Sequence, residues 1–90
     1  MQTITTTIVN KRGLHARAAM KFVELARQYP CEVQVSTLDS QLVDGKNILS
    51  LMLLAAGQGK ALKVQASGEQ STQALTALQQ LISAGFDEED

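Results

Sequence analysis

The residues best suited to chemistry in this 90-residue chain are its single histidine, His15, and the arginine two positions later, Arg17. A neutral imidazole is a competent nucleophile near neutral pH, because its ordinary pKa is about 6.5. A run with helical apolar spacing starts directly after His15, and the first turn of a helix carries unpaired N–H groups and the positive end of the helix dipole. A lone histidine can be an ordinary surface or core residue, but this position favours holding a phosphoryl group.

Other kinds of site find less support in the residue pattern. One histidine and one cysteine, Cys31, cannot supply three or four convergent metal ligands, so we expect neither a metal nor another cofactor. The glycines at 57 and 59 lack the spacing of a phosphate-binding P-loop, and no serine stands at a strand-to-helix elbow. No carboxylate lies near His15 in the sequence to activate water, which favours phosphoryl transfer over hydrolysis.

Charge is distributed unevenly along the chain. The net charge is −1, but four of the nine acidic residues lie in 87–90, so residues 1–86 carry eight basic and five acidic groups, a net of +3. The basic residues near His15 form either a solvated face or a docking patch for an anion or an acidic partner. Three aromatic residues argue against single-stranded nucleic-acid binding, which usually needs several stacking platforms. No signal segment and no membrane-spanning apolar run is evident, so a cytoplasmic location is expected.

Hydrophobic periodicity predicts the elements that must position His15. The predicted order is β-α-β-β-α-β-α in a single α+β domain over residues 1–86, with helices covering one face of an open sheet, followed by an acidic tail at 87–90 that we expect to be disordered. One apolar stripe is predicted on the first helix, formed by Ala16, Ala19, Met20, Val23 and Ala26. Strands are predicted over 2–9, 31–37, 41–43 and 61–66, and helices over 16–28, from the N-cap Asn47 to 56, and over 71–83.

Two sequence blocks resemble one known family. The first is Asn10-Lys-Arg-Gly-Leu-His-Ala-Arg-Ala-Ala, and the second is Val43-Asp-Gly-Lys-Asn-Ile-Leu-Ser-Leu-Met-Leu-Leu-Ala-Ala. Both are similar to motifs of the HPr family, the small histidine phosphocarriers of the phosphoenolpyruvate-dependent phosphotransferase system. The resemblance covers the whole chain and implies an open-faced β-sandwich, in which three helices cover one face of a four-stranded antiparallel sheet.

The resemblance also implies a function. His15 would accept a phosphoryl group on Nδ1 from phosphorylated enzyme I and pass it to IIA-type acceptor proteins, with Arg17 as the supporting cation. We expect the phosphate to be held by the amides of Ala16 to Ala18 together with Arg17, in a protein that works as a monomer. An alternative is a regulatory module that binds partners according to the phosphorylation state of His15. The implied partner surface joins the first two helices at Ala16, Met20, Ile48, Leu49, Met52 and Leu53.

Two positions depart from the resemblance, and the C-terminal segment refines it. Many relatives have proline where this chain has Ala18, inside the first helical turn. The serine that is a regulatory phosphorylation site in some members falls on Asn47, which can cap a helix but cannot be phosphorylated. The ending from Ser83 to Asp90 resembles the nitrogen-related branch called NPr, which relays phosphate to regulators.

Overall fold

The structure, a computed structural model, describes residues 1–88. It confirms the predicted order of strands and helices and adds one short 3-10 helix near the end. The elements are β1 (Gln2–Thr7), α1 (Ala16–Ala26), β2 (Glu32–Thr37), β3 (Val43–Asp44), α2 (Ile48–Met52), β4 (Ala61–Ser67), α3 (Ser71–Ser83) and η1 (Gly85–Asp87).

The four strands form one antiparallel sheet in the order β1-β4-β2-β3. Because side chains alternate across a strand, the register places one apolar row across the whole sheet. That row consists of Ile4, Val64, Val35 and Val43. It faces the helices, whereas Thr5 and its exposed pairing partner Lys63 lie on the uncovered face. The sheet therefore has the one-sided hydrophobic pattern of an open-faced sandwich.

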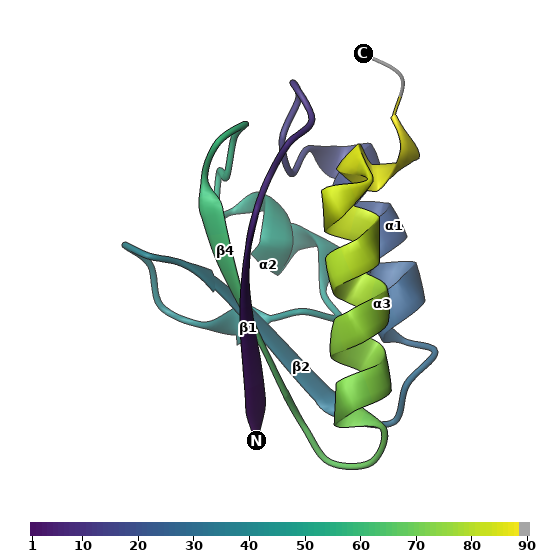
Figure 1. The fold of residues 1–90 in the computed structure, drawn as a ribbon. Helices are drawn as coiled ribbons and strands as arrows, with labels where there is room; N and C mark the ends of the chain where they lie inside the picture. Colours follow the sequence, from purple (N-terminus) through teal and green to yellow (C-terminus); the bar gives the residue numbers. More distant parts are fainter. Residues whose placement is uncertain (89–90) are drawn as a thin grey trace.

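Helices α1 and α3 pack side by side on the apolar face of the sheet, and α2 packs against α1 (Figure 1). The predicted stripe on α1 was partly wrong. Ala19, Val23 and Ala26 are buried as predicted, but Ala16 and Met20 are exposed. Ala18 and Phe22, which are four residues apart and so share a face, are fully buried instead. The buried face of α1 is thus rotated away from Met20, which leaves that side chain free at the surface.

The first two helices end earlier than predicted, because the backbone changes to 3-10 hydrogen bonding after each of them. Beyond Ala26, the N–H of Gln28 bonds the carbonyl of Leu25, and beyond Met52 the N–H of Ala55 bonds the carbonyl of Met52, both at 3.1 Å. These three-residue spacings are those of a 3-10 turn and end the α-helical pattern. The second helix is therefore only five residues long, whereas α3 runs over Ser71–Ser83 as predicted.

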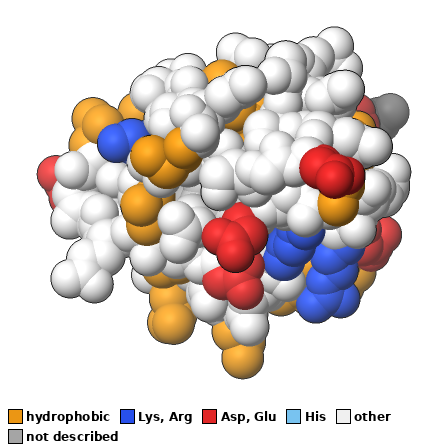
Figure 2. Space-filling model, turned by 90° about the horizontal axis from the view of Figure 1, so that it is seen from below, with side chains coloured by type: hydrophobic (Ala, Val, Ile, Leu, Met, Phe, Trp, Pro, Cys, Tyr) orange, Lys and Arg blue, Asp and Glu red, His pale blue; other side chains and the backbone are white. Residues whose placement is uncertain are grey.

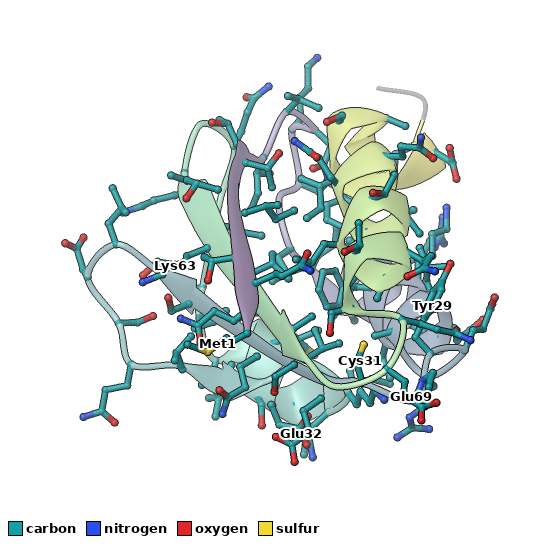
Figure 3. The ribbon with its side chains drawn as sticks, turned by 60° about the horizontal axis from the view of Figure 1, so that its bottom comes forward. Met1, Tyr29, Cys31, Glu32, Lys63 and Glu69 are labelled. Atoms are coloured by element: carbon teal, nitrogen blue, oxygen red, sulfur yellow. The ribbon has the colours of Figure 1, made fainter. Side chains whose placement is uncertain are left out.

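Cys31 lies directly before β2, and Glu32 is the first residue of that strand. Figure 3 shows the Cys31 sulfur pointing into the molecule and Glu32 pointing out. The cysteine is 1% exposed and its thiol is free, so it serves as a small apolar side chain of the core. The end of the molecule on which these residues lie is opposite the C-terminus, and there acidic and basic side chains adjoin one another (Figure 2).

Candidate functional site

The loop that precedes α1 is held tightly against the segment that precedes β4. Gly13 has φ +66°, and a Cβ on it would lie 2.5 Å from the carbonyl oxygen of Ala56. The next residue, Leu14, is 5% exposed, and its N–H donates to that same oxygen at 2.9 Å. Only glycine fits this backbone position without strain. The loop therefore delivers His15 to one defined place, directly ahead of the helix.

His15 is the N-cap residue of α1. Its backbone is extended, with φ −78° and ψ −178°, and its carbonyl accepts the first intrahelical bond from Ala19 at 2.8 Å. The amides of the next three residues, 16–18, have no carbonyl earlier in the helix to which they could donate. Within the described residues, the His15 side chain does not cap them. The imidazole, 24% exposed, thus stands beside three outward N–H groups at the positive end of a helix dipole.

Two arginines lie near His15 in the chain, one in the first turn of α1 and one in the loop before it. Arg17 is exposed in the first turn of α1, and none of residues 1–88 forms an ion pair with it. Arg12, in the loop, acts electrostatically on the carboxylate of Glu88. An exposed guanidinium beside free amides can form charge-assisted hydrogen bonds with an incoming phosphate.

Glu88 is a site residue that sequence reasoning missed. Its Oε2 accepts a hydrogen bond from Nε2 of His15, and its Oε1 accepts one from Nδ2 of Asn10 at 2.6 Å. The same amide nitrogen of Asn10 donates to the carbonyl of Gly13 at 2.9 Å. Burial raises the pKa of Glu88, but the bonds from Asn10 and His15 and the charges of His15 and Arg12 outweigh it, so the pKa lies below its ordinary value.

The expectation that the acidic tail is disordered was wrong for its first two residues. Asp87 belongs to η1, and Glu88 is only 9% exposed at its side chain. Residues 89–90 lie outside the described part of the chain. The sequence did contain one indication that the tail is ordered: the aromatic residue Phe86 directly follows Gly85 and precedes the acidic residues. The Phe86 side chain is completely buried, so it anchors the end of the chain in the core and directs it toward α1.

The apolar residues expected on a partner surface divide into exposed and partly buried ones. Ile48 is partly buried and packs against the core, and Ala16 is exposed but small. The large exposed side chains among them, which we call the apolar patch, lie on α1 and on or directly after α2, two helices that contact one another. They are Met20 (47% exposed), Leu49 (72%), Met52 (39%) and Leu53 (84%).

Asn47 caps α2 as predicted. Its Oδ1 accepts a hydrogen bond at 2.9 Å from the N–H of Ser50, one of the otherwise unpaired amides of the first turn. Asn47 itself is exposed. In residues 1–88, no helix is both long enough and apolar enough to cross a membrane.

Fold and site together define a class of protein: a small open-faced α+β sandwich that presents one histidine at the amino end of its first helix. Residues 2–84 match the family model described as "PTS HPr component phosphorylation site". The chain therefore belongs to the HPr family of phosphotransferase-system phosphocarriers.

Relatives support this assignment along the full chain. "Phosphocarrier protein HPr" of Pseudomonas aeruginosa is 51% identical over 88 residues, which cover 98% of each chain. "Phosphocarrier protein NPr" of Escherichia coli K12 is 35% identical over 85 residues, 94% of each chain. The crystal structure of HPr-C-His from Thermoanaerobacter tengcongensis has 38% identity and a TM-score of 0.93, and all of both chains is covered.

Proposed function

We propose that His15 accepts a phosphoryl group on Nδ1 from phosphorylated enzyme I and passes it to IIA-type acceptor proteins. The observation that carries this proposal is the position of His15 as the N-cap of α1, with its ring partly exposed beside the free first-turn amides. An imidazole nitrogen is a nucleophile near neutral pH, and these amides suit a bound phosphate. The protein would thus be a covalent intermediate whose chemistry its partners complete.

The phosphate would be held by the amides of Ala16, Arg17 and Ala18 and by the guanidinium of Arg17. The exposed, unpaired state of Arg17 within residues 1–88 supports this role, because its side chain need not leave another ion pair to reach the phosphate. Ala18 keeps an N–H that proline, present in many relatives, would lack. Its methyl group is fully buried, so the first turn remains anchored to the core.

Partner proteins would dock on the apolar patch beside the site. Met20 lies on the helix that starts at His15, and Leu49, Met52 and Leu53 lie on or directly after α2. Ala16 would contribute at the edge near the phosphate, and Ile48 chiefly supports α2 from beneath. A carrier that presents one site to successive partners is best served by a monomer, and its partners imply a cytoplasmic place of work.

Asparagine at position 47 implies that regulation by phosphorylation is absent there. The side chain of Asn47 performs the capping that serine would perform, but it has no hydroxyl to accept a phosphoryl group. The nearby Ser50 lies inside α2 rather than at its N-cap, so it does not take the place of the regulatory serine.

The direct test is phosphorylation by phosphoenolpyruvate and enzyme I. Wild-type protein is expected to gain one phosphoryl group that is lost in acid, as a phosphorus–nitrogen bond is, and His15→Ala should gain none. A stoichiometric adduct on His15→Ala would overturn the proposal. Arg17→Met should slow the transfer by roughly tenfold, whereas Arg27→Met, the same change at the other end of α1, should leave it unchanged.

A further inference from the structure

The end of the chain is built to place Glu88 at His15. Gly85, Phe86 and Asp87 have φ values of +66°, +56° and +60°. Left-handed backbone is unfavourable for residues with a side chain, and for a bulky one such as Phe86 it persists only where the surroundings enforce it. Here the Phe86 ring is fully buried, and its carbonyl accepts a hydrogen bond from Lys21 at 2.6 Å. The turn therefore reverses the chain and returns residue 88 to the start of α1.

The Glu88 carboxylate is held there by two donors rather than one. Asn10, itself 3% exposed, donates to Oε1 while it also bonds the Gly13 carbonyl in the loop before the site. Oε2 is left to face Nε2 of His15. Because one oxygen is fixed by Asn10, the direction of the other is fixed as well. This is the arrangement of a carboxylate that orients a histidine.

We propose that Glu88 is a positioning residue for phosphoryl transfer, one that holds the Nε2 proton of His15 and so leaves Nδ1 as the nucleophile. This inference rests on the proposed function. An ionised carboxylate can only accept hydrogen bonds, so Nε2 must be the donor between the two groups. A neutral imidazole has one N–H, and the other nitrogen then carries the free electron pair. Glu88 thereby selects the tautomer that transfer to Nδ1 requires.

The transfer step balances without a proton movement. The electron pair of Nδ1 forms a bond to phosphorus, and the bond between phosphorus and the donor atom of phosphorylated enzyme I breaks, its electron pair staying with that donor atom. The Nε2 proton remains on His15. The ring gains positive charge as Nδ1 shares its electron pair, and the Glu88 carboxylate lies on the opposite ring nitrogen to stabilise that charge.

The tautomer of His15 can be measured in the free protein by two-bond hydrogen–nitrogen correlations of the ¹⁵N-labelled ring. The measurement is made at about pH 8.5, well above the ordinary imidazole pKa. In Glu88→Gln, Oε1 can keep the bond from Asn10, and the new amide nitrogen then donates to Nε2, which drives the proton to Nδ1. Asp87→Asn is the matched control, because it removes a charge from the adjacent residue, which is exposed on η1.

We expect wild type and Asp87→Asn to carry the proton on Nε2, and the ratio of Nε2–H to Nδ1–H to fall about tenfold in Glu88→Gln. Glu88→Ala, which removes the acceptor altogether, should give an intermediate ratio. Equal ratios in wild type and both Glu88 variants would overturn the proposal, as would an equal shift in Asp87→Asn. An unchanged amide spectrum away from the site confirms that each variant is folded.

The rate of phosphorylation by phosphorylated enzyme I separates this inference from the proposed function. Glu88→Gln should be phosphorylated more slowly, by the factor by which its Nε2–H share falls, and Asp87→Asn at the wild-type rate. A shifted tautomer with an unchanged rate would overturn the positioning role and leave the carrier function intact. If wild type itself were never phosphorylated, the proposed function would fail, although the measured tautomer would stand.

Discussion

Lys21 and Phe86 join the middle of α1 to the end of the chain: the Lys21 ammonium donates to the Phe86 carbonyl at 2.6 Å across 65 residues of sequence. That carbonyl belongs to a residue with left-handed backbone, so the bond fixes the turn from which Glu88 projects. The basic residue is thus structural here, and it connects packing in the core with the environment of His15.

Replacing Lys21 with methionine should loosen that turn. The methionine keeps most of the aliphatic stem, so the main loss is one charge-assisted hydrogen bond, and we expect stability to fall by about 1 kcal/mol. Amide hydrogen exchange at residues 85–88 should become faster. Urea unfolding and exchange monitored by nuclear magnetic resonance measure the two effects. Lys63→Met, on the exposed face of the sheet, is the control, and an equal loss there would contradict the assignment.

The fold follows from local patterns more completely than the site does. Alternation in Ala61–Ser67 and helical spacing in Ser71–Ser83 predict those elements almost to the residue. The buried face of α1 was harder to predict, because Ala18 and Met20 are both compatible with a helical apolar stripe and only packing against α2 and α3 decides between them. His15 could be predicted from its neighbours. Its contact with Glu88 spans 73 residues, and no local periodicity contains it.

Gly13→Ala should be strongly destabilising, because it combines a left-handed backbone with a methyl group 2.5 Å from the carbonyl oxygen of Ala56. We expect a loss of about 2–4 kcal/mol in urea unfolding. Gly57→Ala is the control: a Cβ there meets nothing within 4 Å, and stability should stay within about 1 kcal/mol of wild type. Similar losses in both variants would show that the loop is not fixed by this close approach.

Acidification should release Glu88 from the site. The pKa of Glu88 is lowered in the folded protein, chiefly because its bonds from Asn10 and His15 and the nearby charges of His15 and Arg12 exceed the opposing effect of burial. A lowered folded pKa means that the stabilisation is complete above the unfolded pKa and is lost as pH falls through the folded one. Wild type should therefore be more stable than Glu88→Gln at neutral pH, and the two should converge in acid. The side-chain amide signal of Asn10 should move over the same pH range, and a stability difference that remained after the pH had fallen through the lowered pKa of Glu88 would contradict this account.

Asn47 should tolerate serine but not alanine. Serine can accept the hydrogen bond from Ser50 as asparagine does, so Asn47→Ser should change stability by only a few tenths of a kcal/mol, about the spread among good N-caps. Asn47→Ala removes the acceptor from a helix of only five residues and should cost about 1 kcal/mol. Thermal unfolding at one protein concentration compares the three proteins. Equal stability in all three would mean that the cap contributes nothing to α2.

Charge introduced into the apolar patch should weaken partner docking without unfolding the protein. Leu49 and Leu53 are 72% and 84% exposed, so glutamate at either position stays solvated and creates no buried charge. Each variant should raise the KM for phosphorylation by enzyme I, by roughly tenfold if the leucine lies at the centre of the interface. The rate of phosphorylation at saturating enzyme I should change little, because His15 and the first turn of α1 are unaltered.

Leu38→Glu provides a matched control, because Leu38 is 77% exposed but lies in the turn that follows β2, outside the two helices of the patch. It should leave KM unchanged. Leu51→Glu provides the opposite control: that leucine is the fully buried residue of α2, and an ionised carboxylate there should unfold the domain. If Leu38→Glu raised KM as much as Leu49→Glu, the partner surface would not be confined to α1 and α2. If Leu49→Glu unfolded the protein as Leu51→Glu does, the exposed face of α2 would be part of the core rather than a docking surface.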